Sequence, residues 1–584
     1  MKNKEAENKS QAAQIWAEYR RGVAFKEGLG SRGLYEQNKM NERYLIGDQW
    51  HGVNCGNDKP LVRHNIIKRI ADYKMAFIGS GAVSVQYSAE GVPFTSAIEE
   101  QVIKLQKDMA KGDKDAAERL FAMTGWNNNN LLAEEIRTEI SDEEVNFVMN
   151  ALSNYFQVTS ERVRLDELRE QALRNAYCSG TGVLYTWWDD SVETGLFADG
   201  GRKVPVCGDI CCEVLDIENV YFGDPNMDDI QSQPYIIAAQ RKSVDELRRE
   251  AGRYGASEET LLQILPENDT SAQAGQLSEQ ELADSQKAVV LTRFSKVWDK
   301  DGQNYTLKAV KVCGDVVIRP EWDMCIRLYP FSKFNWERRR SCVYGESEIT
   351  YLIPNQIAIN RMITAGVWAA MMTGMPALLV NSDLIGDEIT NDPGQIIRIN
   401  GDVNDVSMAA KYLNPPGVSQ EFNSMTAALI SNTLIQSGAN SAALGDLRPD
   451  NAQAIEAVRE AATLPLQTLQ NRYYGFIEET ARIWAEFWVS LYARRSIRLS
   501  DRQNRWHFPF DGNRYRGLVL SARVDVNSAN VRSDQQVLKA LNDLFEKDMI
   551  DTEQYLSRLP KGTVPNLDGL IRESKGSSES VDAM

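Results

Sequence analysis

The sequence predicts an α+β protein, and three observations support that prediction. Long segments such as residues 347–374 and 451–495 repeat apolar residues at helical spacing. Shorter segments rich in Val, Ile, Tyr and Phe, such as 288–294, are typical of strands. The composition, with 43% hydrophobic and 25% charged residues, is that of a folded protein, and 584 residues suffice for several domains.

The N-terminal part predicts helices followed by a strand. A helical pattern is interrupted by the glycines of residues 28–33 and then resumes until Gly47. Residues 63–77 again carry apolar side chains at helical spacing, and residues 83–87 alternate like a strand. Residues 97–145 are rich in charge and predict a helical insertion with a polar loop.

The middle of the chain predicts a helix and then a series of strands. After helical residues 145–176, the glycine-bearing turn at 180–182 begins a strand. Ser243, with Glu246 three residues later, is a candidate N-cap for a short helix. Further strands are expected at 211–215, 219–225, 288–294 and 305–318.

Two long helices are expected in the C-terminal half. The first runs from Ser347 toward Thr373 and carries only Arg361 as a charge after Glu348. Such a helix is too apolar for an isolated surface helix, so other helices must cover it. The second, at residues 451–495, contains Pro465, which removes a backbone hydrogen bond and predicts a kink.

The charge balance is acidic. Asp and Glu number 82 against 65 Lys and Arg, which gives a net charge of -17. A chain that wraps duplex DNA with a basic face is therefore disfavoured, although local basic patches remain possible. The dense basic patches are residues 338–340 and a group near the C-terminus, for which helix-end positions or phosphate contacts both remain open. That group is Arg494, Arg495, Arg498, Arg502 and Arg505.

The sequence contains no clear catalytic, cofactor or metal site. Its three histidines, His51, His64 and His507, are too few and scattered for a histidine-based centre. The close cysteines lack the paired spacing of zinc sites, and the eight cysteines in total predict reduced thiols. Residues 180–182 lack the remaining parts of a phosphate-binding loop. The close cysteines are Cys207, Cys211 and Cys212, and the paired acids that could bind a divalent ion are Asp189-Asp190 and Asp228-Asp229.

Residues 362–382 are uncharged and approach the length of a membrane span. They also contain Gly366, Gly374 and Pro376, and they lack flanking clusters of Lys or Arg. A buried helix that runs into a strand is therefore favoured over a membrane segment. The N-terminus has no apolar region of the kind found in secretory signals.

Several short segments, read in order, resemble the portal proteins of tailed bacteriophages. The strongest piece is the series between Tyr329 and Asn360, although no single motif is specific, and the order and spacing of all the segments cover roughly residues 40–495. The segments are Gly47-Asp48-Gln49-Trp50, the helix from Asn65 to Met75, Gly180-x-Gly182, the Asn219 to Pro225 strand, Tyr329-Pro330, Gly345-Glu346-Ser347, and Leu352 to Asn360.

The resemblance implies a ring, usually of twelve subunits, with clip, stem, wing and crown regions around a DNA channel. The implied divisions are a wing region at 1–254, a clip at 255–340, a stem helix at 341–375, a second wing part at 376–500, and a short crown and tail at 501–584. Within the second wing part, 437–450 would be a mobile channel loop and 451–495 a kinked helix.

The resemblance also implies particular residues and partners. Gln356, Asn360 and Arg361 would belong to the stem, and Pro465 would set the kink. The candidates in the channel loop are Gly438, Asn440, Ser441, Gly445 and Asp446. The implied partners are further copies of the chain, double-stranded DNA, a terminase packaging motor, a head-tail adaptor protein, and a capsid or scaffolding protein.

The implied function is structural: a conduit for packaging and ejecting the genome at one capsid vertex, assembled in the host cytoplasm without a membrane. No enzyme activity and no cofactor are expected. Two alternatives remain open from the sequence. One is a membrane-associated scaffold that uses residues 362–382, and the other is a hydrolase or nuclease that uses the paired acids.

Overall fold

The computed structural model of the chain contains two compact units, one of residues 1–79 and 87–522 and another of residues 80–86 and 523–584. In the second unit the described helix is α16 (Asp534–Glu546). The other elements discussed below belong to the first unit, except that strands β1 and β14 each have residues in both units. The structure describes residues 2–53, 61–79, 83–90, 142–197, 205–266, 286–298, 305–374, 377–385, 419–439, 452–492, 494–500, 505–515, 519–524 and 534–547, with short runs between 389 and 413 and after 548.

The helices begin and end largely where the sequence signals predict. The glycine stretch at 28–33 separates the first two helices, and Gly47 ends the second with a positive φ of 101°, a conformation that suits glycine. One expected helix at 145–176 is two helices, because Arg164 has a φ of 54° and interrupts the helix. The helices are α1 (Lys2–Glu27), α2 (Leu34–Ile46), α3 (Ile66–Gly79), α7 (Asp142–Val163), α8 (Leu165–Ser179), α9 (Val244–Arg253), α10 (Glu258–Leu262), α12 (Glu348–Gly374), α13 (Gln420–Gln436) and α14 (Ala452–Leu491).

The described strands form a five-stranded sheet in the order β4-β5-β6-β7-β8, a three-stranded sheet in the order β3-β2-β9, and three two-stranded pairs, β1-β14, β10-β11 and β12-β13. The pairings for which a register is resolved are antiparallel. The strands are β1 (Val85–Glu90), β2 (Thr181–Phe197), β3 (Pro205–Asp216), β4 (Val220–Phe222), β5 (Tyr235–Ser243), β6 (Lys287–Trp298), β7 (Tyr305–Cys313), β8 (Val316–Asp323), β9 (Phe331–Asn335), β10 (Ala377–Val380), β11 (Ala410–Leu413), β12 (Arg494–Ser500), β13 (Arg505–Asp511) and β14 (Val519–Val524).

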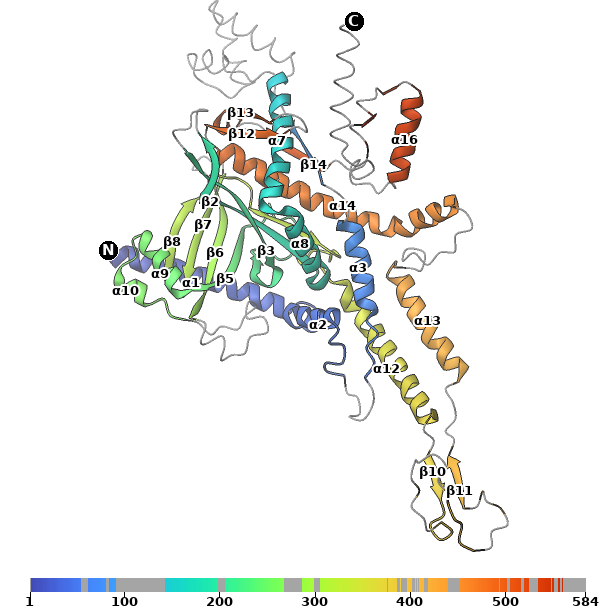
Figure 1. Cartoon of the computed structure of the whole chain (residues 1–584). Coiled ribbons are helices and arrows are strands. Elements are labelled where there is room, and N and C mark those ends of the chain that lie inside the picture. Colours follow the sequence, from blue (N-terminus) through green and yellow to red (C-terminus); the bar gives the residue numbers. More distant parts are fainter. Residues whose placement is uncertain are drawn as a thin grey trace, which may run out of the picture. The chain divides into compact units, whose positions relative to one another are not determined.

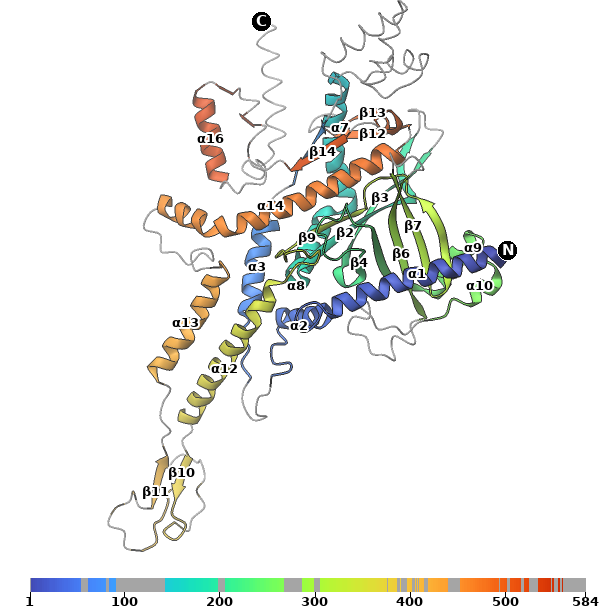
Figure 2. The ribbon, with the colours of Figure 1, turned by 180° about the vertical axis from the view of Figure 1, so that it is seen from behind.

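Both faces of the five-stranded sheet are covered by helices, as Figures 1 and 2 show. On one face, Val289 and Leu291 of β6 pack in a core that includes α1. On the other face, Ala288 and Val290 pack in a core that includes α9. Alternate side chains of a strand point to opposite faces, so a strand covered on both sides has a continuous apolar run, as residues 288–291 do.

The same sheet contains strands from both sides of residue 254, where the wing region was expected to end and the clip to begin. Strands β5 and β6 are neighbours through nine residue pairs, from Tyr235–Ser295 to Ser243–Lys287. Ser243 occupies the N-cap position of α9 as predicted, but its side chain makes no cap hydrogen bond. Val244 N, the first N–H of the helix, donates to Gln286 O at 3.0 Å.

Helix α14 supplies much of the aromatic core. Trp484 and Trp488 are fully buried, and Trp488 packs edge-on against Tyr155 of α7 with ring centroids 5.2 Å apart. On the three-stranded sheet, Ser332 Oγ lies 2.7 Å from Thr480 Oγ1 of the helix. Pro465 lies inside α14, and Figure 1 shows the helix changing direction between its N-terminal end and its longer C-terminal part. That the bend originates at Pro465 stays a prediction.

Helices α12 and α13 run antiparallel with the β10-β11 pair between them in the chain. Asn355 Nδ2 donates to Thr433 Oγ1 at 3.3 Å near one end of the helix pair, and a Cβ on Gly366 would lie 3.5 Å from the Phe422 ring toward the other. The predicted run of helix into strand at 362–382 is confirmed, but much of it is exposed rather than buried. None of the helices in the described part of the chain has the length and apolarity that a membrane crossing requires.

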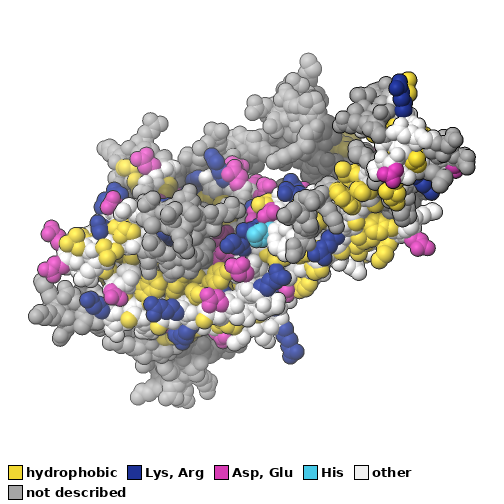
Figure 3. Space-filling view, turned by 90° about the horizontal axis from the view of Figure 1, so that it is seen from below, with side chains coloured by type: hydrophobic (Ala, Val, Ile, Leu, Met, Phe, Trp, Pro, Cys, Tyr) yellow, Lys and Arg dark blue, Asp and Glu magenta, His cyan; other side chains and the backbone are white. Residues whose placement is uncertain are grey.

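Hydrophobic side chains gather on the surface of this α12-to-α13 segment, which Figure 3 shows as a yellow area toward one end of the molecule. Met425 is 66% exposed and Tyr412 is 59% exposed. Residues 347–374 were expected to be covered by other helices, and much of the second half of α12 is instead exposed. The exposed apolar side chains of the segment are Tyr351, Val367, Met371, Met372, Leu379, Val380, Ile396, Ile397, Tyr412, Leu413, Met425 and Ile435.

Two leucines provide a test of the five-stranded sheet as the core of this region. We expect Leu291→Ala to lower the free energy of unfolding by about 2–5 kcal/mol, because its side chain is fully buried between β6 and α1. Leu262→Ala, at a position that is 69% exposed, should change it by less than about 0.5 kcal/mol. Denaturant unfolding followed by tryptophan fluorescence measures both, and equal effects would contradict the assignment of the core.

Candidate functional site at the base of α12

The segments that carry the portal resemblance come together where α12 begins. Gln49 follows α2, Asn65 precedes α3, Gly180 follows α8, and the stretch from Gly345 leads into α12. These positions are far apart in the sequence, and hydrogen bonds of buried side chains connect them. We call this meeting point the stem junction.

Gln356 of α12 caps the N-terminus of α3. Its Oε1 accepts hydrogen bonds from Ile66 N at 3.0 Å and Ile67 N at 3.4 Å. Its Nε2 donates to His64 O at 2.6 Å. The first backbone N–H groups of a helix have no partner within the helix, so this amide satisfies two of them inside the protein. The glutamine side chain is 1% exposed.

Asn360, one turn further along α12, extends the same network. Its Oδ1 accepts from His64 N at 3.0 Å and from Gln356 Nε2 at 3.0 Å. Its Nδ2 donates to Gln49 Oε1 at 2.7 Å, and Thr364 Oγ1 accepts from Val62 N at 3.2 Å. The chain from residue 62 to residue 67 is thus held along α12 by three successive turns of that helix.

Asn65 links the end of α2 to the start of α3. Its Oδ1 accepts from Lys68 N at 3.0 Å, as an N-cap side chain does. Its Nδ2 donates to Leu45 O at 3.2 Å and Tyr44 O at 3.4 Å, which are carbonyl groups at the C-terminal end of α2. One asparagine therefore supplies hydrogen-bond partners to backbone groups at the ends of two helices at once.

A buried ion pair joins α3 and α12 at a second point. Lys74 Nζ lies 2.6 Å from Glu348 Oε1, and both side chains are less than 10% exposed. Burial, with the nearby charge of Glu348, raises the pKa of Glu337 above its usual value. Removing one partner of such a pair would leave the other charge buried and uncompensated.

Backbone contact between two glycines closes the other side of the stem junction. Gly180 has a φ of +82°, and a Cβ there would lie 2.7 Å from the carbonyl carbon of Gly345. A Cβ on Gly345 would in turn overlap the carbonyl oxygen of Gly180. Ser347 then caps α12, because its Oγ accepts from Ile349 N at 3.1 Å and donates to Tyr177 O at 2.6 Å.

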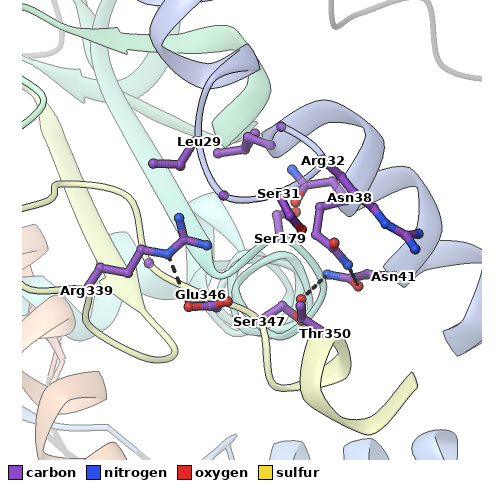
Figure 4. Close-up of a pocket in the computed structure, with 15 residues that line it drawn as sticks. Leu29, Ser31, Arg32, Asn38, Asn41, Ser179, Arg339, Glu346, Ser347 and Thr350 are labelled. Atoms are coloured by element: carbon purple, nitrogen blue, oxygen red, sulfur yellow. Dashed lines mark hydrogen bonds and ion pairs between the residues drawn. The ribbon is translucent and has the colours of Figure 1, made fainter. Parts of the chain in front are cut away.

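A pocket opens beside these glycines, between the α1–α2 turn and the first turn of α12 (Figure 4). Asn41 bridges its floor, since its Nδ2 donates to Cys178 O at 2.9 Å and to Thr350 Oγ1 at 3.3 Å. Arg339 lines one side and pairs with Glu346 at 3.3 Å. Asn41 is hydrogen-bonded to both of its partners here and Arg339 is ion-paired, so we assign the pocket to the packing of the stem junction.

The structure separates the predicted site residues into groups. Gln356 and Asn360 lie in the buried network, whereas Arg361 is exposed on the same helix. Gly438 follows the last turn of α13 with a φ of 76°, and its N donates to Ile435 O at 3.0 Å. The other channel-loop candidates, Asn440, Ser441, Gly445 and Asp446, lie outside the described residues.

The basic patches noted in the sequence are partly accounted for by local contacts. Arg338 lies 3.9 Å from Asp228, and Arg339 is paired as described above. Arg495 is buried on β12 rather than at a helix end, with its guanidinium 3.5 Å from the centre of the Tyr492 ring. That tyrosine donates a hydrogen bond to the buried carboxylate of Asp209. Arg495 therefore has a packing role, which a sequence pattern cannot distinguish from a phosphate contact.

The remaining candidates for chemistry lie apart. Asp189 accepts from Ser191 Oγ at 2.6 Å, which lowers the pKa of its carboxyl, and Lys333 pairs with Asp228 at 2.5 Å. Burial raises the pKa of Cys212 to about 12. The described cysteines, which do not include Cys55, are free thiols. Among the described residues, no group of three or more His, Cys, Asp or Glu side chains lies together in a way that could hold a metal ion.

Sequence reasoning missed the partners that α3 gives to α12. Lys74 sits on the buried face of α3, in line with Ile67, Ile70 and Ile78. A lysine in such an apolar stripe is the signal that could have predicted a buried acidic partner. The partner itself, Glu348, is 274 residues away and could not be chosen from the sequence.

A comparison with protein families matches the phage SU10 portal protein family over residues 121–499, which is well over half of the chain. The family resemblance drawn from the sequence motifs is thereby confirmed. A search of curated proteins finds no match.

The cap on α3 can be tested by a single substitution. Gln356→Ala should lower the free energy of unfolding by about 1–3 kcal/mol, because Ile66 N, Ile67 N and His64 O would lose their buried partner. Hydrogen exchange of the α3 amides, measured by mass spectrometry, should accelerate. Asn355→Ala, which removes a half-buried amide on the same helix, is the control and should leave α3 exchange unchanged. Equal exchange in all three proteins would exclude the cap.

Proposed function

The chain belongs to the phage SU10 portal protein family, and we propose that it forms the ring-shaped DNA channel at one vertex of a phage capsid. As a portal protein it is a structural component of the phage particle. In the proposed role the genome enters and leaves through the ring. A terminase motor docks during packaging, and a head-tail adaptor attaches afterwards. Capsid or scaffolding protein surrounds the ring.

The observation that carries this proposal is the exposed apolar surface of α12, α13 and the β10-β11 pair. We call the six exposed residues on the two helices the stem surface. A chain that stays monomeric rarely exposes a contiguous apolar area of this kind, so another protein surface is expected to cover it. The stem surface consists of Tyr351, Val367, Met371, Met372, Met425 and Ile435.

A second copy of the chain is the proposed cover. The exposed side chains lie on both α12 and α13, so one copy can use one helix against the other helix of its neighbour. Repeating such a head-to-tail contact closes a ring when the rotation between copies divides a full turn. Twelve copies remain our expectation for the ring, from the family resemblance.

The arrangement of these elements also supports a different division of the chain. We propose that α12 and α13 together form the stem, and that residues 375–418, which contain β10 and β11, form the clip. Residues 255–340 would then belong to the wing, because β6, β7 and β8 continue the sheet begun by β4 and β5. A two-stranded ribbon is marginally stable alone, so neighbouring copies are expected to support the clip.

The channel loop and the kinked wing helix remain part of the proposal. Gly438 ends α13, and α14 begins at Ala452, so residues 439–451 connect the stem to the wing helix. Aromatic side chains anchor α14 and support its role as a fixed element, since Trp484, Phe487 and Trp488 are at most 1% exposed. We propose that Pro465 lets the N-terminal part of α14 bend independently of that anchored part.

The family role is structural, and we propose that the protein itself catalyses no reaction. The energy for packaging would come from the docked motor. The two alternatives, a membrane-associated scaffold and a hydrolase, gain no support from the family match or the fold.

Assembly mass tests the proposed ring directly. The wild-type protein should form an assembly of several 65.7 kDa subunits, with and without reductant. An assembly of twelve would confirm the expected ring size. Met371→Lys places a charge on the stem surface and should shift the protein toward the 65.7 kDa subunit. Leu262→Lys, at a site that is 69% exposed on α10, should leave assembly intact. A wild-type protein that stays at 65.7 kDa would refute the proposal.

A further inference from the structure

A group of cations lies on the surface of the stem junction, and we call it the basic cluster. It comprises Arg63, Lys68, Arg69 and Arg361, together with His64. All five side chains are exposed. Four full positive charges in one place stand out in a chain whose net charge is -17.

Hydrogen bonds of the stem junction bring these residues together. His64 N donates to Asn360 Oδ1 at 3.0 Å, which holds Arg63 and His64 beside the turn of α12 that carries Arg361. The cap from Gln356 fixes the start of α3, and so it fixes the first turns that carry Lys68 and Arg69. The basic cluster is therefore a fixed surface built from two segments nearly 300 residues apart.

The position of Lys68 and Arg69 is unfavourable for the helix that carries them. They are the third and fourth residues of α3, and its first turn contains no acidic residue. The N-terminal end of a helix carries a partial positive charge, so cations there destabilise it by about 0.3–1 kcal/mol each. Residues that lower local stability in this way are candidates for a role in binding rather than in stabilising the fold.

Among the residues that the structure describes, the cluster has no acidic partner. In the described part of the chain, none of its four cations forms an ion pair with a carboxylate, including those of Asp48 and Asp72. By contrast, Arg338 and Arg339 face Asp228 and Glu346. The basic cluster thus presents positive charge that remains free for an external anion.

We propose that the basic cluster binds phosphate groups of double-stranded DNA. This inference rests on the proposed function, which brings DNA to the portal, and it identifies where the chain would contact that DNA. Exposed Lys and Arg side chains on a fixed surface bind the phosphate backbone without reading base sequence. Contact should therefore be independent of sequence and strongly dependent on salt.

Two double variants with the same charge change test the assignment. Lys68→Gln with Arg69→Gln removes two cations from the basic cluster. Because these cations oppose the α3 dipole, their removal should not destabilise the fold. Arg249→Gln with Arg253→Gln removes two exposed cations from α9 and serves as the control. Each assembled protein is titrated against one duplex of fixed length by fluorescence anisotropy at several salt concentrations, and its assembly mass is measured alongside.

The expected result is a weakening specific to the cluster. The cluster variant should bind DNA more weakly, and its plot of log affinity against log salt should flatten by about 0.9 for each phosphate that the protein no longer neutralises. The control should match the wild type in both respects. The duplex should be bound equally well when its sequence is scrambled.

Three outcomes would overturn the inference. The first is a wild-type assembly that does not bind the duplex at low salt. The second is a cluster variant with the affinity and salt dependence of the wild type. The third is a cluster variant that dissociates into 65.7 kDa subunits, which would mean that the cations pair with carboxylates of a neighbouring copy. A wild-type ring with either of the first two results would refute this inference alone, whereas the absence of any wild-type ring would refute the proposed function.

Discussion

The geometry of the larger unit depends on a side chain that caps a helix from the other half of the sequence. Gln356 satisfies the first N–H groups of α3 from 290 residues away. The Lys74–Glu348 ion pair joins the same two helices at another point along both of them. One contact would let α12 pivot about it, whereas two separate contacts fix its direction relative to α3.

That fixed direction explains why the stem can carry exposed apolar side chains. The first half of α12 is held in the protein by buried residues such as Ile349, Leu352 and Ile359. Its second half has one described helical neighbour, α13, and most of its side chains are exposed. The junction therefore supports a projecting helix pair that its own chain does not cover. In the proposed ring, a neighbouring copy would supply the missing cover without a change in the fold of one subunit.

Local signals in the sequence were enough to predict most helices and several strands. Gly47 predicted the end of α2, and the segment at 288–294 predicted a strand, which is β6. Helix α13 was not predicted, because its buried residue is Thr433 and it has no apolar stripe of its own. If α13 contacts a neighbouring copy, as proposed, it would not need the apolar stripe of a helix that packs within one chain.

The candidate site was only partly predictable for a related reason. The motifs near Gln356 and Gly345 could be recognised as a series, but not why they occur together. Gly345 is required by the carbonyl of Gly180, and Gln356 is required by backbone groups of α3, so each motif is explained by a distant segment. Which distant segments meet depends on the topology of the fold, and the spacing of motifs along the sequence does not reveal it.

The distribution of charge follows from the same arrangement. Beyond Glu348, α12 carries Arg361 as its charged residue, and α13 carries Glu421. A stem with so little charge offers DNA phosphates neither ion pairs that would hold them nor repulsion that would hinder them. The basic cluster lies at the base of that stem, on the segment fixed by Gln356 and Asn360. In a ring, each copy would then hold DNA at one level and leave it free to slide along the rest of the stem. In this proposed arrangement, weak, salt-sensitive contacts confined to one level would reconcile retention of the genome with its movement, which a uniformly basic channel could not do.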